Sequence, residues 1–462
     1  MINVAYDRIL VYDEYDKPLF PYPNLGKYKP YGHWHFDFKN LDSLLEQTNF
    51  KLPIKLRNGL SIELEKFARS LDGQNLSLAP INGSYLLPFQ VVKLEDILKT
   101  NEPFIYPVMV HSLNFFKENP IIDLPMKLVD ALKNNQAKLL FVQPFEGDFG
   151  MHETDFIFFK NLSKKYNIDK SQIIMITGNL KIKEIYDNRH NEDKVFMVYP
   201  YSWFHTFNFS EKLLNDFNYF SNSNKNNKKL FHFLCFNLRV RPHRLCIFGE
   251  LQTNAKLLKK CVVSLFGTDD KQPYNINNFY NIISSFLSDD YKHNKLRLLE
   301  FYKNYDSTMD FIYDEGITPT TYYGINKEAH SNTFVNIVTE TQISSETIFL
   351  SEKIFKPIYS LQPFIMIGSP NSLKKLKELG FKTFDKWWDE SYDEETDFTK
   401  RFEKIIDVME IISEWSLDEC YKITQEMQTI LNHNFDVLFK NKERIKLVEF
   451  FQSEKKISKK LI

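Results

Sequence analysis

The fold class is decided by FVNIVTETQISSETIFLSEKIFKPIYSLQPFIMIG, residues 334–368. The stretch opens with an apolar, β-branched run and closes with a second one, and both runs predict buried strands. The segment between them has the apolar spacing of a helix that begins at Ser351. A strand, a helix and a further strand in this order are typical of a parallel sheet. The stretch therefore predicts an α/β fold.

The same alternation continues on both sides of this stretch. The C-terminal half contains further strands and helices, in the order LFHFLCFN, RPHRLCIFGELQTN, CVVSLFG, a charged helical stretch from 275 to 315, and NSLKKLKELG after residue 368. A second alternating set begins at Met126, in the order AKLLFVQPF, ETDFIFFKNLSKKYN, QIIMITGN and KVFMVYPYSWF. Long helices are predicted from Asp397 onward. We therefore expect two Rossmann-like halves followed by C-terminal helices.

The length also favours two domains, because 462 residues exceed the roughly 250 to 300 at which single cores stop growing. Residues 1 to about 125 suggest short strands and loops, with one helix near 58–70. The polar segment 208–229 has no helical or strand period and is predicted to be a linker. The predicted domains are 1–222 on the acceptor side, 223–440 for nucleotide-sugar binding, and 441–462 as a basic helix or tail.

Composition bounds the partners and the compartment. A net charge of -1 and a pI of about 6.8 give no overall field for nucleic acid, so no stable nucleic-acid complex is expected. The four cysteines form no CxxC pair, which favours a reducing compartment without structural zinc. The first twenty residues predict neither a signal peptide nor a membrane anchor, so we expect a cytoplasmic protein. The basic end SEKKISKKLI predicts a solvated terminus, with weak peripheral membrane contact as the alternative.

The first candidate constellation lies where the strand before residue 340 gives way to the helix that follows. Ser351 is a suitable N-cap, and the amide end of its helix is a seat for a diphosphate, with Lys353 adding a positive charge. Glu340 and Glu352 are carboxylates among apolar residues, and a ribose hydroxyl would be a suitable partner for one of them. The alternative is that Glu352 complements the helix dipole and Lys353 extends into water.

The second constellation, LCFNLRVRPHR, follows the first strand of the C-terminal half. One guanidinium group can donate two hydrogen bonds to the oxygens of a phosphate. A helix that begins at Pro242 directs its free backbone N–H groups toward the same place. We expect phosphate binding here, and the alternative is a solvated basic turn. The candidate residues are Asn237, Arg239, Arg241 and Arg244, while His243 is given no catalytic role.

The third constellation is FVQPFEGDFGMHETD, at a strand end in the N-terminal half. Transfer with inversion needs a base within hydrogen-bond reach of an acceptor hydroxyl. Glu146 is the first candidate for this base and Asp148 the second. The alternative is an acidic turn that caps the next helix. Aromatic residues of YPYSWFHTF, such as Tyr199 and Trp203, suit either an acceptor sugar or core packing.

The order of residues in the first constellation resembles the donor-binding motif of the α-1,3-fucosyltransferases. On that resemblance Glu340 takes the place of the motif's first glutamate. Glu352 and Lys353 take that of the Glu-Lys pair, which contacts the ribose and phosphates of the nucleotide. The family also places a phosphate-binding arginine after the equivalent of the LFHFLCFN strand, where this chain has Arg239. Thr341 stands where the family has Asn, so the sugar is not specified.

The resemblance implies a GT-B glycosyltransferase, with two Rossmann-like domains facing a cleft. Such an enzyme moves a sugar from a nucleotide diphosphate donor, with a GDP-sugar such as GDP-fucose favoured, to a hydroxyl of a glycan or other acceptor. The transfer is expected to be inverting. No Asp-x-Asp occurs in the chain, so we expect no essential metal or other cofactor. Two alternatives stay open: a nucleotide-binding partner protein without turnover, and a phage-type DNA-base glycosyltransferase.

Overall fold

The structure is a computed structural model in which the chain divides into two compact units. Unit 1 comprises Met1–Asn208 and Lys442–Ile462, and unit 2 comprises Phe209–Asn441. Both are α/β units with parallel sheets, as the alternation of strands and helices predicts. The structure describes residues 2–6, 8–10, 35–37, 89–109, 116, 122–143, 153–189, 194–202, 212–237, 240–265, 278–304, 325–440 and 450.

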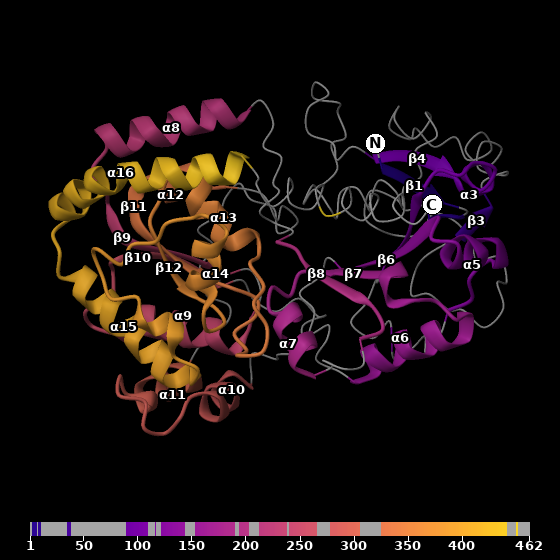
Figure 1. The fold of residues 1–462 in the computed structure, drawn as a ribbon. Coiled ribbons are helices and arrows are strands. Elements are labelled where there is room, and N and C mark those ends of the chain that lie inside the picture. Colours follow the sequence, from indigo (N-terminus) through magenta and orange to yellow (C-terminus); the bar gives the residue numbers. More distant parts are fainter. Residues whose placement is uncertain are drawn as a thin grey trace, which may run out of the picture. The chain divides into compact units, whose positions relative to one another are not determined.

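Unit 1 contains a six-stranded parallel sheet of order β4-β1-β5-β6-β7-β8 (Figure 1). Its strands are β1 (Ile2–Tyr6), β4 (Phe89–Lys93), β5 (Phe104–Met109), β6 (Ala137–Gln143), β7 (Ile173–Thr177) and β8 (Met197–Pro200). The parallel sheet therefore begins well before Met126, where the sequence pattern had placed its start. A separate antiparallel pair joins β2 (Arg8–Leu10) to β3 (His35–Asp37).

The helices of unit 1 connect strands that follow one another in the sequence, and the helix over Glu153–Tyr166 is the one that the sequence pattern predicts. They are α3 (Leu94–Ile97), α5 (Met126–Lys133), α6 (Glu153–Tyr166) and α7 (Ile182–Arg189), with a 3-10 turn η3 (Lys170–Gln172) before β7. Aromatic packing fixes α6 on the sheet, because the ring of Phe159 lies 4.9 Å from that of Phe141 and 4.2 Å from that of Phe196. All three side chains are buried, so they form part of the hydrophobic core of the unit.

Unit 2 contains a four-stranded parallel sheet of order β10-β9-β11-β12. The strands are β9 (Phe231–Asn237), β10 (Cys261–Leu265), β11 (Thr333–Thr339) and β12 (Phe364–Ile367). The helices are α8 (Lys212–Asn226), α9 (Pro242–Thr253), α10 (Phe279–Phe286), α11 (Lys295–Lys303), α12 (Lys327–Asn332), α13 (Glu352–Tyr359), α14 (Ser372–Glu378), α15 (Phe398–Ser413) and α16 (Leu417–Lys440), with a 3-10 turn η6 (Ser391–Glu394).

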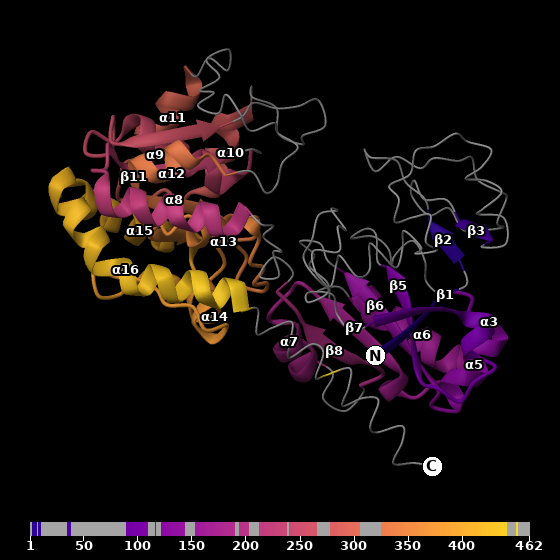
Figure 2. The same ribbon diagram turned by 90° about the horizontal axis from the view of Figure 1, so that it is seen from above.

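The predicted linker 208–229 is wrong over most of its length, because it forms helix α8 of unit 2. The segment is polar in composition, but one side of the helix is apolar. Phe220 is buried, and the ring of Phe217 lies 4.7 Å from that of Phe435 on α16. Figures 1 and 2 show α8 beside α16. The predicted domain boundary at 222 therefore falls inside a helix, whereas the units divide at Asn208 and again at Asn441.

Helix α13 ends in a tight reversal that delivers the chain into β12. Leu361 adopts a left-handed backbone with φ of 50°. The N–H of Gln362 donates to the carbonyl of Pro357, and the N–H of Leu361 donates to that of Ile358, which is the Schellman pattern. The side chain of Asn224 donates to the carbonyl of Leu361 at 2.8 Å. Helix α8 thus holds the turn that brings β12 back alongside β11.

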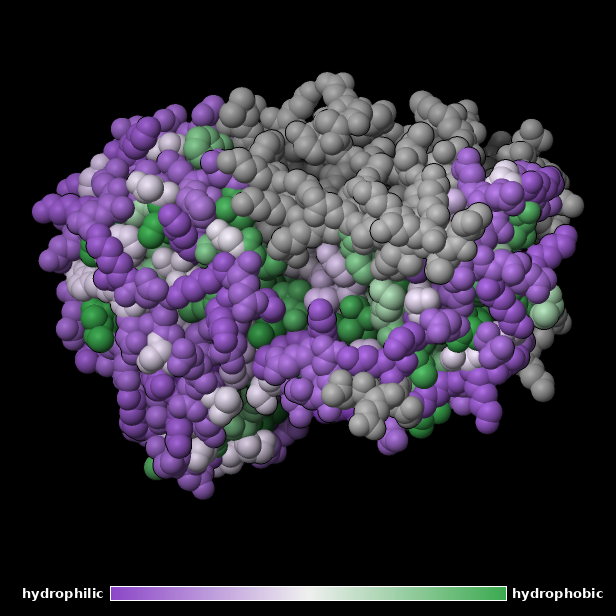
Figure 3. Space-filling model, in the orientation of Figure 1, coloured by the Kyte–Doolittle hydropathy of each residue, from purple (hydrophilic) through white to green (hydrophobic). Residues whose placement is uncertain are grey.

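The surface of the described residues is mainly hydrophilic on the face drawn in Figure 3, with apolar residues in small groups. Leu296 and Leu230 are among the large apolar side chains that stay exposed. Scattered exposed apolar residues of this kind are normal in globular proteins. None of the helices in the described ranges has both the length and the apolar run needed to cross a bilayer.

Candidate functional site

The candidate site lies at the carboxyl edge of the sheet in unit 2. Strands β9 and β11 are parallel neighbours that end at Asn237 and Thr339, so these two residues lie side by side. The hydroxyl of Thr339 donates to Oδ1 of Asn237 at 2.6 Å, and both side chains are buried. Ligands of open α/β sheets bind beyond this edge. The strand register therefore places the first two constellations in one region.

Glu340 follows β11 and is fully buried. Both oxygens of its carboxylate accept from the backbone N–H of Ser351 at 3.2 Å, which closes the base of the loop between the two residues. Its own N–H donates to the carbonyl of Ile367 at the end of β12. Burial raises the pKa of Glu340 to about 7, although the charge of Lys353 works against this rise. The carboxyl group is thus engaged in shaping the site.

Helix α13 starts directly at this loop, with Ser351 as its N-cap. The Ser351 hydroxyl accepts from the N–H of Lys353 at 3.3 Å, as the sequence predicts. The ammonium of Lys353 lies 2.6 Å from Oε1 of Glu352, 3.3 Å from the Ser351 hydroxyl and 3.5 Å from that of Thr341. The helix therefore presents both its amide end and a lysine at the sheet edge.

The two carboxylates differ in ionisation because only one of them contacts the lysine directly. Burial alone would raise the pKa of Glu352, but the contact with Lys353 and the nearby charge of Lys356 lower it below its usual value. The side chain of Glu352 is 8% exposed, whereas that of Lys353 is 24% exposed. Lys353 is therefore the charged group of this cluster that solvent, or a ligand, can reach.

The start of α9 contributes the second cluster. Arg241 is the N-cap residue and Pro242 occupies the first helical position, as expected. Arg244 is buried, and its Nη2 donates to the carbonyl of Thr339 at 3.2 Å. Nε2 of His243 donates to the carbonyl of Glu340 at 2.8 Å. Burial and the neighbouring Arg244 lower the pKa of His243 well below its usual value, so the imidazole is neutral.

Residues of the two constellations therefore meet at one edge of unit 2. Of the predicted nucleotide ligands, six are joined there through contacts among themselves or with the ends of β9 and β11: Asn237, Arg244, Glu340, Ser351, Glu352 and Lys353. Arg241 stands at the start of α9. Arg239 lies outside the described residues.

The predicted acceptor-side residues cannot be placed in the same way. Glu146 and Asp148 lie outside the described residues, as does Trp203. Tyr199 lies on β8, and Glu153 is the exposed first residue of α6.

Two contributors to the site escaped the sequence analysis. Thr339 is the last residue of a predicted strand, and the pairing of β9 with β11 brings it to Asn237. Arg401 of α15 donates from Nη2 to the carbonyl of Ile343, inside the loop between Glu340 and Ser351, at 2.9 Å. No local pattern connects residues this far apart in the sequence.

Within the described ranges, no group of three or more His, Cys, Asp or Glu side chains is arranged to hold a metal ion. Comparison with known proteins adds no relative, since no family model, no curated protein and no solved structure matches the chain.

Proposed function

We propose that the chain is a GT-B glycosyltransferase in which unit 2 binds a nucleotide diphosphate sugar, with a GDP-sugar favoured, and unit 1 serves the acceptor. One observation carries the proposal: the ammonium of Lys353 stands at the amide end of α13, on the carboxyl edge of a parallel sheet. This arrangement suits the diphosphate of a nucleotide, because the helix dipole and a partly exposed cation both favour negative charge.

The same group suits the chemistry of transfer. When the bond to the sugar breaks, negative charge grows on the leaving diphosphate, and fixed donors stabilise that charge without reorganisation. Lys353 and the amide end of α13 would supply these donors, joined by Arg239 and Arg241 from the second constellation. From the sequence pattern, Glu146 is the first candidate for the base that accepts the proton of the acceptor hydroxyl, and Asp148 is the second. We further propose that the acceptor is a hydroxyl of a glycan or of another compound, and that the protein is cytoplasmic.

The test is calorimetric titration of the full chain with GDP, UDP and CMP, without added metal. Lys353→Ala is compared with Lys375→Ala on α14, because both lysines pair with one glutamate and their side chains are similarly exposed, at 24% and 27%. We expect GDP to bind the wild type and the Lys375 variant, and to bind the Lys353 variant at least about tenfold more weakly. Equal losses in both variants, or no binding by the wild type, would remove the proposal.

Turnover separates an enzyme from a nucleotide-binding partner protein. Slow hydrolysis of GDP-sugar is expected for the wild type and is expected to fall in Glu146→Gln or in Asp148→Asn while GDP affinity is kept. Binding without any hydrolysis or transfer would favour the partner protein instead.

A further inference from the structure

Arg401 is a buried cation at an unusual place in unit 2. It lies near the N-terminal end of α15, where the helix dipole disfavours positive charge, and it is only 2% exposed. Burial lowers the pKa of its guanidinium to about 10, although nearby Asp393 and Glu395 work against this. A buried charge of this kind is costly unless its donors are used. Helix stability therefore does not explain the residue.

The guanidinium joins two segments that are distant in the sequence. Nη1 donates to the carbonyl of Glu395 at 2.6 Å, next to η6, and Nη2 donates to the carbonyl of Ile343 at 2.9 Å. Ile343 belongs to the loop 341–350, whose base is closed by the bond from Ser351 to Glu340. Arg401 thus holds the first part of this loop, at Ile343, while the bond between Glu340 and Ser351 joins its two ends.

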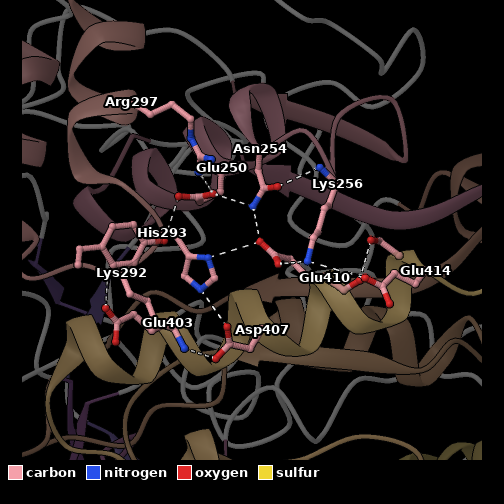
Figure 4. A network of polar contacts seen from close by, with 12 residues as sticks. Glu250, Asn254, Lys256, Lys292, His293, Arg297, Glu403, Asp407, Glu410 and Glu414 are labelled. Carbon is pink, nitrogen blue, oxygen red and sulfur yellow. Dashed lines mark hydrogen bonds and ion pairs between the residues drawn. The ribbon is translucent and has the colours of Figure 1, made fainter.

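Helix α15 is itself fixed, as Figure 4 shows. Nε2 of His293 lies 3.0 Å from Asp407, and Nδ1 lies 3.4 Å from Glu410. Glu410 also accepts from the side chains of Asn254 and Lys256, both at 2.8 Å. These contacts tie α15 to the end of α9 and to the segment before α11. Arg401 therefore projects from a helix whose position is set independently of the loop.

We propose that Arg401 is a positioning residue that fixes loop 341–350, and through it the start of α13, for the diphosphate of the donor. The inference rests on the proposed nucleotide function for its purpose. The loop-fixing step stands on the contacts alone. A lysine could keep the charge and one carbonyl contact, but only the planar fork of arginine spans both segments.

The experiment compares Arg401→Gln and Arg401→Lys with Arg297→Gln. Arg297 of α11 pairs with the buried Glu250 of α9, so its loss also removes a guanidinium contact inside unit 2 but leaves the loop alone. Amide hydrogen exchange of residues 341–350 is followed by mass spectrometry on the ligand-free full chain, and GDP affinity and melting temperature are measured on the same samples.

We expect Arg401→Gln to speed exchange in 341–350 and to weaken GDP binding, each about tenfold, with part of both effects rescued in Arg401→Lys. Arg297→Gln should lower the melting temperature without changing either. Unchanged exchange in both Arg401 variants, or an equal change in the Arg297 variant, would overturn the inference. If the wild type binds no nucleotide, the proposed function fails, while the exchange data still decide whether Arg401 fixes the loop.

Discussion

Replacing Glu340 with Gln keeps the size of a buried side chain but removes its ability to ionise. The amide oxygen of Gln can still accept from the N–H of Ser351, as the carboxylate does at 3.2 Å. In the wild type, burial raises the pKa of Glu340 from 4.5 to about 7. Such a shift corresponds to a cost of about 3 kcal/mol at most for the ionised side chain in the folded state.

The sign follows from proton binding. Between pH 4.5 and about 7 the folded protein keeps the proton on Glu340 while the unfolded chain has lost it. The contribution of Glu340 to the free energy of unfolding therefore falls as pH rises through this window and levels off above it. The Gln variant lacks this contribution, so it should gain stability relative to the wild type as pH rises, by at most about 3 kcal/mol.

The assay is urea unfolding of both proteins at several values from about pH 5 to about pH 8, followed by circular dichroism. The quantity of interest is the difference between the two proteins, because other buried carboxyls such as Glu390 and Asp393 also have raised pKa values and cancel in the difference. If the difference in free energy of unfolding between the two proteins does not change across this pH range, Glu340 is ionised throughout it. That result would refute the conclusion that burial raises the pKa of Glu340.

Three further outcomes are expected. Ser351→Ala removes the cap of α13 and should lower the free energy of unfolding by about 1 kcal/mol in urea, whereas Ser351→Thr should keep most of it. Burial lowers the pKa of His330 from 6.5 to about 3, so between those values only the unfolded chain takes up this proton. The contribution of His330 to stability should therefore drop by about 1.4 kcal/mol for each unit by which the pH is lowered in this window, and the stability of His330→Gln relative to the wild type should rise by that amount. Burial raises the pKa of the thiols of Cys235 and Cys246, so a thiol reagent should label them in urea far faster than in the native protein; equal rates would contradict their burial.

The elements around the site were predictable because their signals are local. The strand β11, the N-cap Ser351 and the helix α13 follow from an apolar run, a capping residue and helical spacing within one stretch. Pro242 at the first position of α9 gave the second helix start in the same way. Parallel pairing then fixes which strand ends meet, and this is why residues from both constellations share one edge.

What could not be predicted depends on distant parts of the chain. Strands β1, β4 and β5 belong to the sheet of unit 1, but Pro and Gly around them suggested isolated strands and loops. Helix α8 shows its apolar side only once α16 is present to cover it. Arg401 contacts a carbonyl 58 positions away in the sequence, and no local spacing encodes such a bond.

The charged groups of the site differ in what they contact, and this difference decides which substitutions are informative about binding. Arg244 and His243 donate to the main chain of Thr339 and Glu340, and the carboxylate of Glu340 accepts from the next segment of the main chain. Removing any of these groups leaves a buried partner unsatisfied and disturbs the sheet edge whether or not a ligand binds there. The ammonium of Lys353 instead contacts side chains and keeps access to solvent. Lys353→Ala still leaves the carboxylate of Glu352, which is 8% exposed, without its ion pair. A loss of nucleotide affinity in this variant is therefore attributed to binding where its melting temperature stays that of the wild type, whereas the same loss in an Arg244 variant could not be.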